Sequence, residues 1–186
     1  TKTNQTELID IHDINLYGYP IKDFTNISNM PKHAIRFDIG QCTALTSLKG
    51  CPEHLEDYFK MAGCESLKSL EYGPTFVGGH YFANTSGLTS LEYAPTEVGG
   101  VFSISSCTHL KSLQHIPRKM KGLKMSGMYQ IRNLHDIHRF IDVIDGNLEL
   151  YENNVVESIL GLMMINITGQ IFFSISEYSK LDKENV

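Results

Sequence analysis

The sequence lacks the long apolar segments that mark membrane and secreted proteins. Its longest apolar run, residues 159–165, is interrupted by Gly161, whereas a membrane-spanning helix needs about 20 apolar residues. No signal-peptide core follows the polar start TKTNQTELID. We therefore expect no membrane partner. A chain that begins at Thr1 is consistent with loss of an initiator methionine, and this favours a cytoplasmic location.

An excess of positive charge is also lacking. Sixteen Lys and Arg residues stand against 21 Asp and Glu, which gives a formal net charge of -5 at pH 7. Because affinity for nucleic acid depends on grouped basic side chains, we expect no nucleic-acid partner. The acidic excess is too small to indicate a mimic of DNA.

The motifs of the common catalytic sites are missing as well. The sequence contains no G-x-x-x-x-G-K-[ST], no G-x-S-x-G and no G-x-G-x-x-G. His135 and His138 form an H-x-x-H pair that lacks the glutamate of zinc hydrolases, so a loop is the better interpretation. The basic residues at 118, 119, 121 and 124 fit a solvated loop better than a phosphate site. We expect a protein that is not an enzyme and holds no cofactor.

What the sequence does contain is a repeat. Five prolines, at positions 31, 52, 74, 95 and 117, are separated by 21 or 22 residues. An apolar pair in an L-x-x-L pattern precedes most of these prolines, and an apolar residue follows three positions later. In this alignment His138 replaces the sixth proline and Ile141 is the sixth apolar residue. Such self-similarity predicts a stack of coils that stabilise one another.

Each repeat also carries a short strand. Apolar residues alternate with other residues in the same place in every repeat, which is typical of a strand with one buried side. The inward pairs are Phe37 and Ile39, Phe59 and Met61, Tyr81 and Ala83, Phe102 and Ile104, Leu123 and Met125, Leu148 and Leu150, and Ile171 and Phe173. We predict a solenoid of about seven coils of 21–23 residues, with a parallel sheet on one face and irregular or 3-10 segments on the other. Tight backbone geometry is expected at residues 78–79 and 99–100, which are Gly-Gly pairs.

The segment FSISSCTHL, residues 102–110, resembles the leucine-rich-repeat signature L-x-L-x-x-N/C-x-L. The stretch LTSLEYAPTEVGGVFSIS, residues 88–105, is similar to degenerate leucine-rich-repeat-like (LRR-like) proteins of large tailed bacteriophages. The resemblance covers residues 21–176 and implies a protein-binding solenoid without catalytic residues. Residues 1–20 are then expected to form an N-terminal cap, and residues 177–186 a C-terminal cap or tail.

Three of the four cysteines occupy one repeated position. Cys42, Cys64 and Cys107 stand where other repeats have Ser86 or Met128, and no C-x₂₋₄-C pair is present. A position that accepts serine and methionine favours packing over metal binding, so we expect no metal site. A disulfide between Cys42 and Cys64 of adjacent coils is conceivable, although a cytosolic location argues against it.

The outward strand positions are the ones that the fold does not explain. Aromatic and apolar side chains follow one another there on adjacent strands, and exposed clusters of this kind mark interaction surfaces. The predicted partner-binding residues are Tyr58, Lys60, His80, Phe82, Asn84, Val101, Ser103 and Lys124. We expect this face to bind another protein, with Asp38 and Glu149 beside the two lysines to steer association.

Two alternatives stay open for this face. A terminal segment could fold over it and cover Tyr58 and Phe82. The chain could also be a structural or assembly protein that associates with itself through the solenoid, although we favour a monomer. If the resemblance to phage proteins holds, an inhibitor of a host defence or regulatory protein is the natural role.

Overall fold

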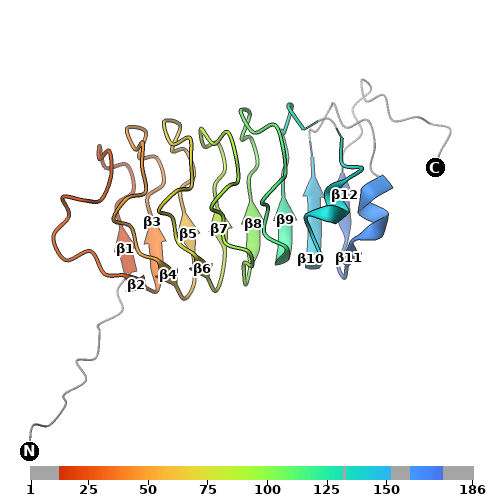
Figure 1. The fold of residues 1–186 in the computed structure, drawn as a ribbon, viewed down its shortest axis with the longest axis horizontal. Coiled ribbons are helices and arrows are strands. Elements are labelled where there is room, and N and C mark those ends of the chain that lie inside the picture. Colours follow the sequence, from red (N-terminus) through yellow and green to blue (C-terminus); the bar gives the residue numbers. More distant parts are fainter. Residues whose placement is uncertain (1–12, 132, 152–159, 174–186) are drawn as a thin grey trace, which may run out of the picture.

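The computed structural model describes residues 13–131, 133–151 and 160–173 (Figure 1). Over these residues the chain winds into a parallel β-solenoid of about seven coils, which confirms the predicted architecture. The strands lie side by side in the order of the sequence, so that each coil adds one rung to the stack. The proposed C-terminal cap or tail, residues 177–186, lies outside the described residues.

Within the described residues the larger sheet has nine strands, and every neighbouring pair is parallel. They are β1 (Asp13–Asn15), β3 (Arg36–Asp38), β5 (Phe59–Lys60), β7 (Tyr81–Phe82), β8 (Val101–Ser103), β9 (Lys119–Lys124), β10 (Val143–Leu150), β11 (Asn166–Ile167) and β12 (Ile171–Phe173). Strand β1 lies inside the stretch assigned above to the N-terminal cap, and it pairs with β3 as a further rung. Both β11 and β12 pair with β10.

The register of this sheet is the one that the alternation predicts. Phe37 pairs with Phe59, Phe59 with Tyr81, and Tyr81 with Phe102. Their rings form a continuous row inside the solenoid, with centroids 5.1–5.8 Å apart. All four side chains are buried, and each contributes about 1.5–3 kcal/mol of transfer free energy. The L-x-x-L leucines close the core from the other side.

A second parallel sheet, which the sequence pattern did not indicate, follows a neighbouring side of the coils. It contains β2 (His33–Ala34), β4 (His54–Leu55) and β6 (Phe76–Val77). Single bridges from Val77 to Val98 and from Glu97 to Lys119 continue its ladder. Strands β9 and β10 are long enough to join both ladders, which therefore form two walls of one core.

Most of the described coils turn through two corners where the backbone is left-handed. One corner precedes the cysteine column, at Gly18, Gln41, Gly63, Thr85, Ser106 and Gly127. The other follows the L-x-x-L segment, at Asn29, Gly50, Tyr72, Tyr93 and His115. The φ angles lie between 53° and 89°, a region that suits glycine and strains most other residues. The stack imposes these corners even where the local residue disfavours them.

The cysteine column belongs to the core, as predicted. Each thiol points back along the stack and donates to a main-chain carbonyl oxygen of the preceding coil: Cys42 to Leu16, Cys64 to Ile39 and Cys107 to Ala83, at 3.0, 3.1 and 3.0 Å. All four cysteines are buried and unpaired, so the disulfide considered for Cys42 and Cys64 is not formed.

The Gly-Gly pairs allow adjacent coils to approach closely. A β-carbon at Gly99 would overlap the Gly78 carbonyl oxygen, and one at Gly78 would overlap that of Glu56. The tight geometry expected at these pairs therefore comes from contact between coils. None of the four glycines is among the described residues with positive φ.

The coil between β9 and β10 departs from the predicted alignment. Leu148 pairs with Leu123, twenty-five positions earlier, and Met120 pairs with Ile144 rather than with Ile141. Ile144 is therefore the apolar residue of this repeat, and Ile141, three residues before it, takes the proline position that was predicted for His138. The additional residues form the 3-10 turn η1 (Ile137–Arg139).

Two local predictions change with this coil. His138 lies within η1, and its Nδ1 is 3.0 Å from the His135 carbonyl oxygen. The solvated loop predicted for the basic cluster is wrong in part, because residues 119–124 form strand β9. In the described part of the chain the 3-10 turns are η1 and η2 (Leu160–Met164), and the L-x-x-L segments are irregular as expected.

Candidate functional site: the outward face of the larger sheet

Three of the predicted residues form an aromatic cluster on adjacent strands. The rings of His80 and Phe82, on the same side of β7, stack with their centroids 5.4 Å apart and an interplanar angle of 22°. Tyr58 is the residue before β5, beside His80 in the register, and its ring centroid lies 6.0 Å from the Arg36 guanidinium carbon. His80 is exposed, whereas Tyr58 and Phe82 are half-buried. These rings are thus accessible and also held in place by neighbours.

A main-chain hydrogen bond orients the ring of His80. The Val101 N–H donates to Nδ1 of His80 across 3.0 Å, so Nδ1 is the acceptor and a neutral ring carries its proton on Nε2. Val101 is half-buried beside this contact. The next coil therefore selects both the rotamer and the tautomer of His80.

Asn84 and Ser103 form a polar link between two coils. The Ser103 hydroxyl donates to Oδ1 of Asn84 at 2.5 Å, and the Ser105 N–H donates to the same oxygen at 3.2 Å. Asn84 is half-buried, but Ser103 is only 2% exposed. Ser103 therefore lies on the predicted face without being open to a partner, and its contact is with Asn84.

The two predicted lysines are already paired with carboxylates on neighbouring coils. Lys60 lies 3.1 Å from Asp38, and Lys124 lies 2.9 Å from Glu149. Asp38 is buried and also accepts the Gly40 N–H, so it is fixed in position. These lysines act as components of ion pairs at the border of the aromatic cluster, which weakens their role as free positive charges.

Tyr17 extends this face, and the sequence interpretation missed it. Its ring centroid lies 5.7 Å from the Lys60 ammonium, and it has room because Gly40 has no side chain. Tyr17 is exposed. Extending the strand alternation back by one repeat, into the stretch assigned to the cap, would have revealed it.

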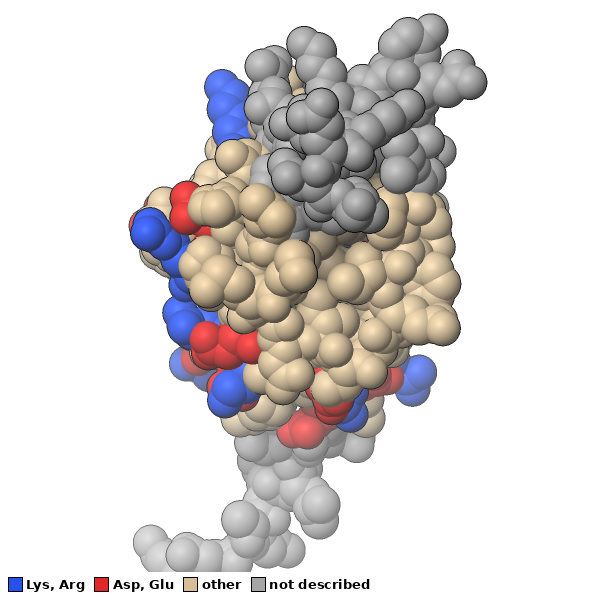
Figure 2. Space-filling view, turned by 90° about the vertical axis from the view of Figure 1, so that its right-hand side faces the viewer, with Lys and Arg blue, Asp and Glu red and all other residues tan. Residues whose placement is uncertain are grey.

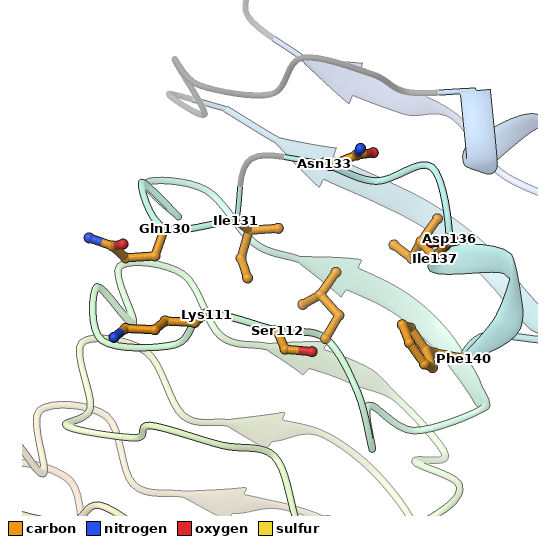
Figure 3. Close-up of a pocket in the computed structure, with 9 residues that line it drawn as sticks. Lys111, Ser112, Gln130, Ile131, Asn133, Asp136, Ile137 and Phe140 are labelled. Atoms are coloured by element: carbon orange, nitrogen blue, oxygen red, sulfur yellow. The ribbon is translucent and has the colours of Figure 1, made fainter.

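A hollow of about 310 Å³ lies across the core from this face, where the longer coil diverges from its neighbour (Figure 3). Ile131 and Ile137 flank it, Phe140 lies at one end, and Lys111 and Gln130 lie at the other. The lining mixes apolar and polar side chains without a convergent set of polar groups. Its shape follows from the residues that form η1.

The thiols do not form a reactive centre. Burial raises the pKa of Cys51 and of Cys64 to about 12, and it also raises the pKa of Cys42 and Cys107. Since the thiolate is the nucleophile, these groups are inert near neutral pH. Over residues 13–131, 133–151 and 160–173, no group of three or more His, Cys, Asp or Glu side chains could hold a metal ion.

The described part of the chain contains no helix that is long and apolar enough to cross a membrane. Comparisons with protein-family models, with curated proteins and with solved structures found no match.

Proposed function

We propose that this chain is a non-enzymatic protein-binding module that grips its partner with the outward face of the larger sheet. The observation that carries the proposal is the cluster of Tyr58, His80 and Phe82 on adjacent strands. Aromatic side chains dominate the energetics of protein interfaces, and clusters at the centre of a surface are the usual anchors.

The cluster is favourable for binding because it is ordered before a partner arrives. Ordering a side chain at an interface costs about 0.5–1.5 kcal/mol, and stacking and half-burial have already covered part of this cost. The ion pairs of Lys60 and Lys124 border the cluster, as a polar rim borders an apolar centre.

The finer classification depends on the repeat pattern of the sequence. Under this proposal the chain is an LRR-like protein of the kind found in large tailed bacteriophages, and it acts in the host cytoplasm. Its partner is then a host defence or regulatory protein that it inhibits. Such a target fits a surface that has aromatic anchors.

The test starts with a partner captured from the native host lysate and confirmed by binding of the purified proteins. We expect the double variant Tyr58→Ala/Phe82→Ala to weaken this affinity at least about 30-fold, since an anchor residue contributes about 2 kcal/mol or more. The matched control is Tyr72→Ala/Tyr93→Ala, which removes two exposed rings from the other corner of the coils. Unchanged affinity in the first variant, or equal loss in the control, contradicts the assignment of this face.

A second candidate function is self-association through the C-terminal end of the stack. Met163 and Met164 on η2 are 84% and 70% exposed, and Ile171 and Phe173 on β12 are also exposed although they are in register with buried residues of β10. Figure 2 shows that the part of this end not drawn in grey is mainly uncharged, with charged side chains along its left and lower edges.

Sedimentation velocity across a range of concentrations distinguishes this candidate. Self-association through this end predicts a sedimentation coefficient that rises with concentration and falls to the monomer value in Met163→Glu. A monomer at every concentration excludes the assembly role and leaves the binding proposal unaffected.

A further inference from the structure

The second sheet carries a row of stacked rings on its outer side. His33, His54 and Phe76 occupy equivalent positions on β2, β4 and β6. The ring centroids of His33 and His54 are 5.0 Å apart and those of His54 and Phe76 are 4.2 Å apart, with interplanar angles of 16° and 13°. The spacing is that of the coils themselves, about 4.8 Å, so the stack of coils builds a stack of rings.

This row stops at Phe76. The equivalent residue on the next coil is Glu97, since Val77 pairs with Val98. The Glu97 carboxylate lies 2.9 Å from the Lys119 ammonium, one coil farther along, and so turns away from Phe76. Among the residues that the structure describes, no ring therefore covers the face of Phe76 opposite His54, and the Phe76 side chain is 45% exposed.

A groove begins at this position. Phe76 forms one wall, Val77, Val98 and Met120 lie beneath, and the Glu97–Lys119 pair stands at the rim, around a volume of about 430 Å³. Gly78 and Gly99 lie along it and contribute no side chains. At the next two coils Lys121 and Asp145 line its far side. The groove is thus a flat, apolar slot with charged groups at its edges.

We propose that this groove binds a planar aromatic side chain of an extended peptide segment, which takes the place of the missing fourth ring and stacks on Phe76. A ring at the coil spacing continues the arrangement of His33, His54 and Phe76. The apolar floor covers the edge of the ring, and Glu97 and Lys119 lie where the N–H and C=O groups of a peptide backbone could pair with them. This is a second site, on a different sheet from the face proposed above.

The charges favour a peptide over a nucleotide. Two acidic groups, Glu97 and Asp145, line the groove beside Lys119 and Lys121, and the lysine at 119 is already paired. The whole chain has a net charge of -5. A phosphate-bearing ligand needs an uncompensated cluster of basic groups, whereas a neutral side chain such as indole needs only the slot.

The absence of tryptophan from the chain provides a clean assay. The probe is N-acetyltryptophanamide, excited where tyrosine does not absorb, and the readouts are its anisotropy and emission wavelength as the full chain is titrated. We expect saturable binding with a dissociation constant on the order of 0.1–1 mM, in keeping with a ligand of this size. Adenosine is added as a competitor.

Two variants test the position of the probe. Phe76→Ala removes the stacking surface and should weaken binding at least tenfold, while Phe76→Tyr should retain it. Glu97→Phe places a ring of the chain itself in the slot and should abolish binding while leaving the fold unchanged by circular dichroism. Phe82→Ala, on the larger sheet, is the matched control and should bind the probe as the unmodified chain does.

The affinities of the three variants and the effect of adenosine decide whether the probe binds in this groove. Loss of binding in Phe76→Ala and in Glu97→Phe, with retention in Phe82→Ala, supports the site. Unsaturable binding, or full affinity in Glu97→Phe, overturns it, and so does displacement of the probe by adenosine at equal or lower concentration. Because Phe82→Ala disables the other face, failure here and failure of the proposed partner-binding face are separable.

Discussion

Thr85 offers the sharpest test of the corner geometry. It is an exposed threonine with φ of 53°, at a corner where other coils have Gly18, Gly63 or Gly127. A side chain in this left-handed region costs about 1–2 kcal/mol, and a β-branched residue is among the least suited to it. Replacement by glycine removes that strain. It also raises the conformational entropy of the unfolded chain, which lowers the free energy of unfolding by about 0.5–1 kcal/mol.

The net effect of Thr85→Gly should be a gain of about 1 kcal/mol in the free energy of unfolding, since the relief of strain exceeds the entropic cost. For a chain of this length that corresponds to a Tm increase of about 2–4 °C. The matched control is Thr108→Gly, at an exposed turn position that is not among the residues with positive φ. There only the entropic cost applies, so stability should fall by about 0.5–1 kcal/mol.

The assay is denaturant unfolding of the three proteins, followed by far-UV circular dichroism, with calorimetry for Tm. A left-handed backbone at Thr85 requires the change in unfolding free energy to have opposite signs at the two threonines. If both substitutions destabilise the chain to the same extent, the backbone at Thr85 is not left-handed in solution and the corner geometry is refuted.

Three further changes test the core and the contacts between coils. Phe59→Ala, which removes a buried ring stacked on Phe37, should lower the free energy of unfolding by about 3–5 kcal/mol. Phe76→Ala, on the outer side of the second sheet, should lower it by less than about 1 kcal/mol. Equal losses would show that the row containing Phe37 and Phe59 is not the core. Gly99→Ala should cost at least about 2 kcal/mol, because its β-carbon would overlap the Gly78 carbonyl oxygen. The matched control is Gly122→Ala, where φ is not positive and the nearest atom, on Val101, lies 3.2 Å from a β-carbon. A loss at Gly99 no larger than at Gly122 argues against the close contact. The buried thiols should resist alkylation at pH 8 until the chain is unfolded, and rapid labelling of the native protein would falsify their burial. Burial raises the pKa of Cys51 and Cys64 from 9.0 to about 12, so the contribution of these thiols to stability is complete below pH 9 and is lost as the pH rises from 9 towards 12. In Cys51→Ala/Cys64→Ala, Tm should therefore decrease less over this pH range than in the unmodified chain.

The inward half of the fold was predictable from the sequence. Burial along a stacked coil depends on which residues recur at the coil period, and this is a property of the chain itself. Phe37, Phe59 and Tyr81 therefore appear as a column in the sequence and as a row of rings in the structure. The column also placed Tyr58, His80 and Phe82 on one outward face.

The predicted alignment of the repeats was wrong in the coil between β9 and β10, which is longer than the others. Leu148 stands twenty-five positions after Leu123, and periodicity does not show where the additional residues are absorbed. Hydrogen bonding decides this, because the register of β9 with β10 fixes Ile144 against Met120. His138 therefore belongs to an additional turn, and Ile141 takes its predicted place.

Whether an outward residue is accessible or paired also depends on its neighbours in the adjacent coils. Ser103 has an outward position, yet Asn84 from the previous coil accepts its hydroxyl and the residue is buried. The repeat pattern predicts Lys60 to be an ordinary surface lysine, yet in the structure it forms an ion pair with Asp38. Contacts of this kind join residues about one coil apart, and their geometry is set by how one coil lies on the next.

By itself, then, the sequence determined that the chain forms coils, how long most of them are and which side chains most of them bury, since all three follow from a hydrophobic period within one chain. The predicted inward pair Ile171 and Phe173 is the exception, because both side chains are exposed. The tertiary structure alone decided the second sheet, the left-handed corners at Thr85 and Tyr72, and the row of rings that ends at Phe76. These features arise between coils, where the pitch of the stack fixes distances that no local pattern encodes.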